Sequence, residues 1–317
     1  MNESSLGKFH YALRPAKNIE RKMFCEAFAR LSRIAPLPTY RYIGFGSNEF
    51  CDFRLFHERL GIKDMVSIEG RTDAKKRVEF NRPHSCIKME WGLSHDILPT
   101  LDWPRRAIVW LDFDSPLDAK KLIDIALVAG ITKSGSVLLV TVPVEPGDSS
   151  EPDAANKRLK DLKERVGINK VPSSIEAKHL SKWGMANACR VIVHNEILQT
   201  LNARCAPLSP DASIGYDQLF NFHYADGTKM LTVGGIFLNG NDRERLSVKE
   251  HFKDLEFTRS NDTAYAIETP VLTWREMRFL DKCLPRSAAF PKWLPEEERE
   301  RYRKLYRYYP NFTEVEA

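Results

Sequence analysis

The feature that most constrains this 317-residue chain is the glycine turn Gly44-Phe45-Gly46, which stands between an apolar run and a segment of helical periodicity. A second apolar run follows and ends in Glu69. A backbone approaches a ligand closely only where side chains are absent, and a carboxylate ending the next strand can accept both hydroxyls of a ribose. The order strand, glycine turn, helix, strand and carboxylate therefore predicts a site for a nucleoside-containing cofactor.

The residues after the turn separate two classes of cofactor. Pyrophosphate cofactors such as NAD favour G-x-G-x-x-G, whose third glycine lets the helix pack closely and direct its N-terminus at the phosphates. In this chain Gly46 is followed by Ser47, Asn48, Glu49 and Phe50. The third glycine is absent, and an acidic residue near the helix start disfavours a pyrophosphate. The pattern favours S-adenosylmethionine as the cofactor. The alternative is that the glycine pair only forms a turn before the helix and binds no ligand.

The composition is that of a globular protein, since 43% hydrophobic residues can build a sizeable core. The chain has no run of about 18 apolar residues and no secretory signal pattern at its N-terminus, so we expect a cytoplasmic protein without a membrane partner. Its cysteines show neither C-x-x-C nor zinc-ligand spacing. We expect free thiols at Cys25, Cys51, Cys86, Cys189, Cys205 and Cys283.

Positive charge is only mildly in excess, with a net charge of +5 from 48 basic and 43 acidic residues. Basic residues cluster at 71–77, 157–163 and 299–307. We interpret these clusters as solvated faces, and nucleic acid stays open as a partner.

Strands and helices alternate through residue 142, where periodicity and turn residues predict both kinds of element. Expected strands cover residues 40–44, 64–69, 85–91, 106–114 and 136–142. Expected helices cover residues 18–34, 48–60, 95–101 and 117–129, with Gly61 as a C-cap. Such alternation predicts an open α/β sheet of parallel strands with helices on both faces.

A different pattern follows Pro143. Residues 145–153 have loop composition, and two helices are expected at 157–166 and 182–203. Two apolar runs then flank Asp226-Gly227 within residues 219–238, which is a strong hairpin signal. The predicted sheet therefore ends in an antiparallel hairpin.

This order of elements resembles the class I S-adenosylmethionine-dependent methyltransferases of bacterial type, whose seven-stranded Rossmann-like sheet ends with a reversed strand. The resemblance covers about residues 18–240 and rests on the glycine turn, Glu69, the segment 110–114 and the hairpin. One departure is that many members carry an acidic residue just before the turn, where this chain has Tyr42 and Ile43.

The resemblance implies that the glycine turn approaches the methionine end of the cofactor, that Glu69 holds its ribose, and that residues 92–94 lie near its adenine. The predicted cofactor-binding residues are Gly44, Phe45, Gly46, Ser47, Glu69, Gly92, Ser94 and Asp112.

Asp112 and Asp114 are the predicted catalytic residues, because they end the fourth strand at the edge of the sheet where ligands bind. Two apart on a strand, they would point the same way. A carboxylate can stabilise a sulfonium, orient an acceptor or take its proton. The pair also resembles the metal-holding D-x-D of small-molecule O-methyltransferases, but without a visible third ligand we assign no metal. The alternatives are a strand-end carboxylate for Asp112 and a helix N-cap for Asp114.

The acceptor is only partly constrained. The segment from Asp112 to Ser115 lacks the [N/D]-P-P-[Y/F] pattern of enzymes that methylate amines of DNA bases, and no Pro-Cys nucleophile is present. An oxygen, a nitrogen or a small-molecule acceptor fits better, chosen by loops at 70–84 and 143–174 and by the C-terminal region. His84, His95 and His223 are candidate bases, none of them preferred.

We expect a methyltransferase-like domain at residues 1–240, with an insertion at about 145–180, and a mainly helical extension at 241–317. Thr273 with Glu276 predicts one capped helix, and Pro295 opens another. The extension could pack on the core, on a protein partner or on a second subunit. An accessory subunit that senses the cofactor is the alternative function, and an NAD-type oxidoreductase is disfavoured.

Overall fold

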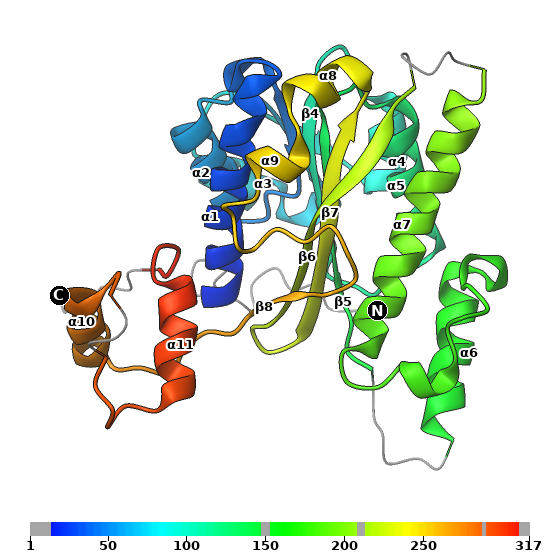
Figure 1. Cartoon of the computed structure of the whole chain (residues 1–317). Helices are drawn as coiled ribbons and strands as arrows, with labels where there is room; N and C mark the ends of the chain where they lie inside the picture. The colour runs from blue at the N-terminus through cyan, green and yellow to red at the C-terminus, as the bar shows by residue number, and fades with distance from the viewer. Residues whose placement is uncertain (1–13, 147–152, 208–212, 287–289, 311–317) are drawn as a thin grey trace.

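The computed structural model of the chain describes residues 14–146, 153–207, 213–286 and 290–310. These residues form one sheet in the order β3-β2-β1-β4-β5-β7-β6-β8, with helices on both faces (Figure 1). Among the described residues, no helix is long and apolar enough to cross a membrane.

The first five strands are parallel, as predicted. They are β1 (Arg41–Gly44), β2 (Asp64–Glu69), β3 (Ile87–Trp91), β4 (Ala107–Asp112) and β5 (Val137–Pro143). The helices that connect them are α2 (Cys51–Leu60), α3 (Lys75–Asn81), α4 (Ser94–Ile97) and α5 (Ala119–Ile131). Gly61 ends α2 with a φ of 69°, a left-handed conformation that suits glycine, so the predicted C-cap is confirmed.

The hairpin predicted around Asp226-Gly227 consists of β6 (Gly215–Ala225) and β7 (Lys229–Leu238). Strand β7 lies between β5 and β6 and is antiparallel to both. The Asp226 side chain reaches back to α1 (Pro15–Ala29), where it accepts hydrogen bonds from the backbone N–H groups of Ala16 (3.3 Å) and Lys17 (3.0 Å). The hairpin turn thus caps the first described helix, whose own N-cap residue makes no side-chain cap.

The sheet has eight strands rather than the seven expected, because β8 (Tyr265–Ile267) pairs in parallel with β6 at Phe222 to Tyr224. This strand comes from the region expected to be mainly helical. The same region contributes α8 (Gly240–Arg245), α9 (Val248–His251), α10 (Trp274–Cys283) and α11 (Glu296–Leu305). Thr273 and Glu276 form the predicted capping box of α10. The division of the chain at residue 240 remains a prediction.

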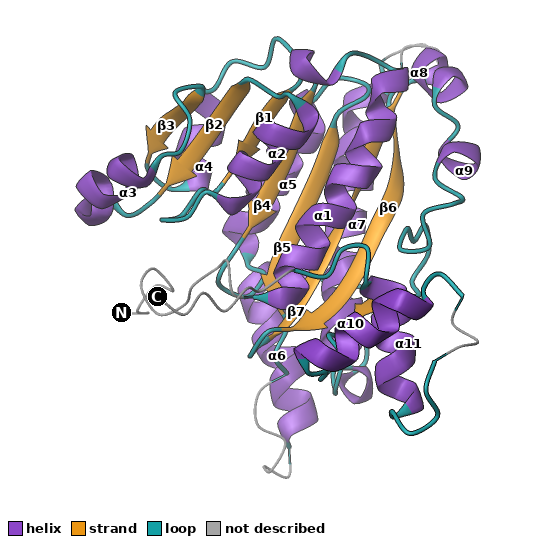
Figure 2. Ribbon diagram, turned by 90° about the vertical axis from the view of Figure 1, so that its left-hand side faces the viewer, coloured by secondary structure: helices purple, strands orange, loops and turns teal. Residues whose placement is uncertain are grey.

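Alternate residues of β4 face two different apolar layers, as expected for a strand buried on both faces. Trp110 packs edge-on against Phe24 of α1 at a centroid distance of 5.1 Å, on the face that α1 and α2 cover (Figure 2). Leu111 lies in the opposite layer with α5, α6 (Ala154–Val166) and α7 (Gly184–Cys205). Asp112, one residue further, therefore faces α1.

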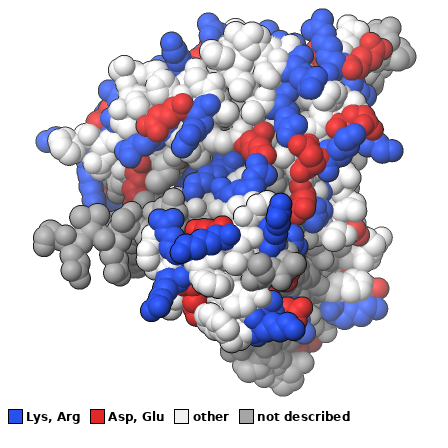
Figure 3. All heavy atoms as spheres, turned by 60° about the vertical axis from the view of Figure 1, so that its left-hand side comes forward, with Lys and Arg blue, Asp and Glu red and all other residues white. Residues whose placement is uncertain are grey.

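Basic and acidic side chains are interspersed on the face that carries α1 and the C-terminal helices (Figure 3). In the predicted basic cluster 299–307, Arg301 pairs with Glu297 (2.6 Å) and Glu298 (2.9 Å), and Arg307 pairs with Glu26 (3.0 Å). This cluster is a solvated face of ion pairs, as interpreted from the sequence.

Candidate active site

A cavity of about 430 Å³ lies at the carboxyl ends of the parallel strands and is lined by residues of their ends and of the segments that follow. Open α/β sheets bind ligands at this edge, and the volume falls within the range typical of small-molecule sites. Seven of the predicted site residues line the cavity: Phe45, Ser47, Glu69, Gly92, Ser94, Asp112 and Asp114.

Gly44 and Gly46 are not among the lining residues. A Cβ atom on Gly46 would lie 2.5 Å from the Phe50 ring and 2.6 Å from Ser67 Oγ, and Gly46 N donates a hydrogen bond to the same Oγ (3.0 Å). A Cβ atom on Gly44 would lie 2.6 Å from the Tyr42 hydroxyl oxygen. The chain's own packing therefore requires both glycines, while the side chains of this turn that reach the cavity are Phe45 and Ser47.

Glu69 ends β2 and is only 8% exposed. Its Oε1 accepts a hydrogen bond from the Arg71 backbone N–H (2.8 Å), which fixes the orientation of the carboxyl group. Burial raises the pKa of Glu69, and the Arg71 N–H opposes this shift only in part. Its backbone carbonyl accepts from Gly92 N (3.0 Å), so the ends of β2 and β3 are held together at the cavity.

Asp124 of α5 contributes a carboxyl group that the sequence interpretation missed. Ser94 Oγ donates to Asp124 Oδ2 (2.5 Å), and Asp124 is 1% exposed. Its Oδ1 is buried without a hydrogen-bond partner among the described residues. Burial raises the pKa of Asp124. The available signal was an acidic residue on the apolar face of the expected helix, seven positions after Leu117 and four before Val128.

The helix N-cap role weighed for Asp114 is wrong, because Asp118 takes that position. The Asp118 side chain accepts from Lys121 N (3.0 Å) at the start of α5. Strand β4 ends at Asp112, so Asp114 lies beyond the strand instead of sharing its face. Asp114 is exposed and lines the cavity.

Asp112 is held by a buried lysine of α1 that the sequence interpretation did not identify. Lys17 Nζ lies 2.8 Å from Asp112 Oδ1, 2.9 Å from Glu20 Oε2 and 3.0 Å from the Tyr224 hydroxyl oxygen. The same ammonium lies 4.4 Å from the centre of the Trp110 ring. Burial lowers the pKa of Lys17, but Asp112 and Glu20 outweigh it, so the pKa is raised and the lysine stays charged.

More buried polar groups lie on α1 and beside the glycine turn. Arg21 is 5% exposed, and its Nε and Nη1 have no hydrogen-bond partner among the described residues. The same holds for Ser47 Oγ and Asn48 Oδ1. The Tyr42 hydroxyl donates to Asp52 of α2.

The candidate histidines are dispersed. His95 lines the cavity, with its Nε2 3.7 Å from Asp96 Oδ1. His223 stacks on Trp183 outside the cavity, and burial lowers its pKa to about 4. His84 packs against His57. Within the described parts of the chain, no three His, Cys, Asp or Glu side chains are grouped to hold a metal.

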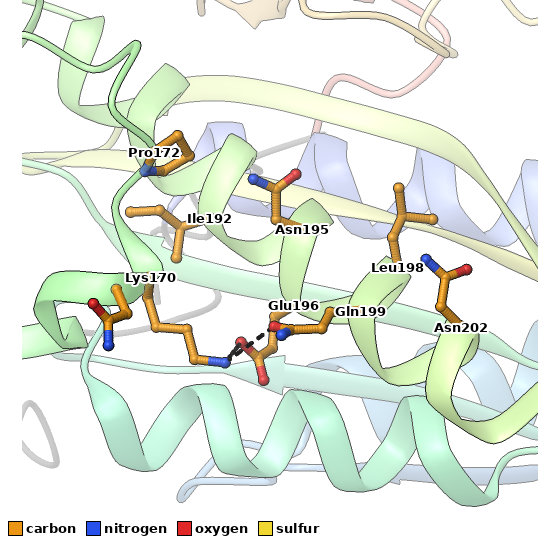
Figure 4. A pocket seen from close by; sticks show the side chains of 9 residues that line it. Lys170, Pro172, Ile192, Asn195, Glu196, Leu198, Gln199 and Asn202 are labelled. Atoms are coloured by element: carbon orange, nitrogen blue, oxygen red, sulfur yellow. Dashed lines mark hydrogen bonds and ion pairs between the residues drawn. The ribbon is translucent and has the colours of Figure 1, made fainter.

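A second hollow of about 460 Å³ lies along α7 and shares no lining residue with the first (Figure 4). Its one lysine and one glutamate neutralise each other, with Lys170 Nζ 2.5 Å from Glu196 Oε2. Amide side chains supply most of its other polar groups, so this hollow offers no free acid or base.

A family model described as "Putative O-methyltransferase" matches residues 9–317 of the chain. The match agrees with the predicted resemblance. No curated protein matches the chain in sequence.

Solved structures of methyltransferases align at low identity. Trm1 from Pyrococcus horikoshii is 11% identical over 71% of this chain and 56% of its own, with a TM-score of 0.43. The N-methyltransferase NodS from Bradyrhizobium japonicum is 11% identical over 70% of this chain and 97% of its own, with a TM-score of 0.38. A methyltransferase of Haloferax volcanii, solved in complex with the Trm112 activator, is 16% identical over 40% of this chain and 55% of its own, with a TM-score of 0.29. The chain spans about half the length of this last relative.

Proposed function

The chain belongs to this O-methyltransferase family, and on that premise we propose that it binds S-adenosylmethionine in the cavity at Glu69 and transfers the methyl group to an oxygen atom of an acceptor. One observation carries the proposal: a buried carboxyl group, oriented by a backbone N–H, ends β2 at the wall of a cavity of suitable size.

The cavity lining suits the cofactor's mixed chemistry. Phe45, Ile68, Leu93 and Phe113 supply apolar surface for a base. Glu69 would accept the ribose hydroxyls. The unpartnered Asp124 Oδ1 is a buried acceptor that the exocyclic amino group of adenine would satisfy.

When bound, S-adenosylmethionine supplies an electrophilic methyl group on a positively charged sulfur. Asp112 is the candidate residue for the acceptor, since Lys17 engages its Oδ1 and leaves Oδ2 to receive a hydrogen bond from an acceptor hydroxyl. In that position Asp112 orients the hydroxyl oxygen and takes its proton as transfer proceeds. Lys17, Glu20 and Tyr224 hold Asp112 in place. Asp114, at the mouth of the cavity, is the second candidate.

Isothermal titration with S-adenosylmethionine and S-adenosylhomocysteine tests the cofactor. The intact chain should bind both, and Glu69→Ala should weaken binding by on the order of tenfold to a hundredfold, because it removes hydrogen bonds to a charged acceptor. Glu58→Ala is the matched control, since Glu58 is exposed on α2 outside the cavity. An intact chain that binds neither compound would refute the proposal.

A second candidate function is that of an accessory subunit, in which the fold is retained and a partner docks on residues 241–317. The observation that favours it is a group of exposed apolar side chains in that region: Val271, Trp274, Phe279 and Trp293. A stable complex through these residues, together with cofactor binding but no transfer by the isolated chain, would favour this function over the first.

A further inference from the structure

A third cavity, of about 770 Å³, lies beside β6 and shares no lining residue with the Glu69 cavity. The consecutive residues 216–219 of β6 form one wall, His194 of α7 contributes to another, and residues 247–253 and 258–260 supply most of the rest. Strand β8 pairs with β6 only from Phe222 onward, and Arg259 N donates to Leu219 O (2.7 Å). The earlier part of β6 has no strand partner on this side within the described chain, so the cavity occupies its open edge.

Positive charge dominates the lining. Arg243, Lys249, Lys253 and Arg259 line the cavity, against the single carboxylate of Asp217. Arg243 neutralises that carboxylate at 2.5 Å. Lys253 also lies 3.0 Å from Glu250, which is not a lining residue, and Lys249 has no ion pair among the described residues. This excess of cations suits a ligand that carries at least two negative charges.

Two buried polar atoms of the lining side chains have no hydrogen-bond partner among the described residues: the Tyr216 hydroxyl oxygen and His194 Nδ1. Tyr216 is 9% exposed, and burial raises its pKa, so the phenol keeps its proton and is a donor without an acceptor. A buried donor left unpaired costs free energy, and native structures hold few of them.

Apolar side chains also line the cavity: Leu219, Val248 and Phe252 belong to the layer of α1, and Tyr216 belongs to the layer of α7. We propose that this cavity binds a nucleotide-sized organic anion, whose phosphates lie at Lys249 and Lys253, whose aromatic part lies against Phe252, and one of whose acceptor atoms receives the Tyr216 hydroxyl. Sites for small organic ligands combine apolar walls with a few convergent polar groups in this way. The proposal is independent of methyl transfer at the Glu69 cavity.

Isothermal titration of the full chain with guanosine triphosphate, and separately with inorganic triphosphate, tests the proposal. Guanosine triphosphate should bind with a Kd below about 1 mM and at least fivefold more tightly than triphosphate, because only the nucleotide uses the apolar wall. The double variant Lys249→Gln, Lys253→Gln should lose tenfold or more in affinity. Lys160→Gln with Lys163→Gln on α6 removes equal charge outside the cavity and should change nothing.

Tyr216→Phe separates a binding role from a structural one. The variant should bind guanosine triphosphate at least threefold more weakly, while its thermal midpoint without ligand stays equal or rises, since a buried hydroxyl without a partner is removed. The proposal is overturned if the intact chain binds no nucleotide, if triphosphate binds equally well, or if the lysine pair has no effect. A fall in the midpoint of Tyr216→Phe also overturns it. Binding lost in Glu69→Ala would instead place the nucleotide in the other cavity, and likewise overturns the proposal.

Discussion

At the scale of single residues, burial decides the behaviour of the acidic groups around the candidate site. Glu69 and Asp124 both have their pKa raised by burial, whereas Lys17, equally buried, stays charged because two carboxylates face it. The raised pKa of Glu69 should show in the pH dependence of cofactor binding. The ionised carboxyl group accepts hydrogen bonds from the ribose hydroxyls better than the protonated one.

We expect affinity for S-adenosylhomocysteine to fall as the pH is lowered from 8 to 5. The loss should begin above the range of an ordinary glutamate, since the pKa of Glu69 is raised and protonation removes an acceptor. Isothermal titration at each pH measures it, with circular dichroism to confirm that the chain stays folded. In Glu69→Gln the pH dependence should flatten, and an equally steep dependence in that variant would assign the effect to another group.

Lys17→Met tests the ion pair itself. The change leaves Glu20 buried without its cation and should lower the free energy of unfolding by about 3–5 kcal/mol, as breaking a buried pair does. Urea unfolding measures the loss. Lys22→Met is the control, because Lys22 lies on the same helix and donates to the Tyr309 carbonyl oxygen (3.2 Å) instead of to a buried carboxylate. Equal losses in both variants would contradict a special role for Lys17.

Sequence reasoning found Glu69 and Asp112 because each ends an apolar run, and a strand end is visible locally. It could not find Lys17, whose partner Asp112 lies 95 residues away along the chain. In the sequence Lys17 lies just before the helix expected at residues 18–34, and nothing near it indicates a partner. Only the packing of α1 across β4 brings the two side chains together.

At the scale of elements, the features that depend on neighbouring residues could be predicted from the sequence. The features that depend on tertiary packing could not. The bounds of β2, the C-cap at Gly61 and the capping box at Thr273 all follow from residues within one turn of each other. The role of the glycine turn follows instead from Phe50 and Ser67, which fill the space a side chain would need.

Gly46→Ala should therefore destabilise the chain by roughly 1–3 kcal/mol through overpacking. Urea unfolding gives the loss, and Gly240→Ala serves as the control because, outside its chain neighbours and its own helix backbone, no described atom lies within 4 Å of the added methyl group. If Gly46→Ala kept full stability and lost only cofactor affinity, the glycine would serve ligand approach, as the family resemblance implied.

At the scale of the whole molecule, the alternation of strands and helices predicted the parallel half of the sheet and the terminal hairpin. The eighth strand escaped prediction because it is three residues long and too short for an alternating pattern. Its partner, β6, stabilises it. Leu305 and Tyr308 also join the main apolar cluster, so the C-terminal region and the sheet share a core.

Tyr265→Ala should lower the midpoint of a single thermal transition, because Tyr265 is buried in β8 against Phe222 at a centroid distance of 6.0 Å. The expected cost is about 3–5 kcal/mol, as for other large buried aromatic side chains. Calorimetry measures it, with Trp274→Ala, at an exposed side chain, as the control. A separate transition for residues 241–317, shifted alone by Tyr265→Ala, would instead support an independent unit beginning near residue 241.

The bond from Asp226 to the start of α1 joins positions 209 residues apart, and Lys17 is one of the two residues it holds. A chain that leaves the ribosome N-terminus first therefore makes α1 long before the carboxylate that caps it exists. The contacts that Asp226 and Tyr224 make with Lys17 therefore form only after the last hairpin has folded. During biosynthesis the site would then be completed late. Chains truncated before the hairpin would carry Glu69 but would lack the contacts that hold Lys17 against Asp112.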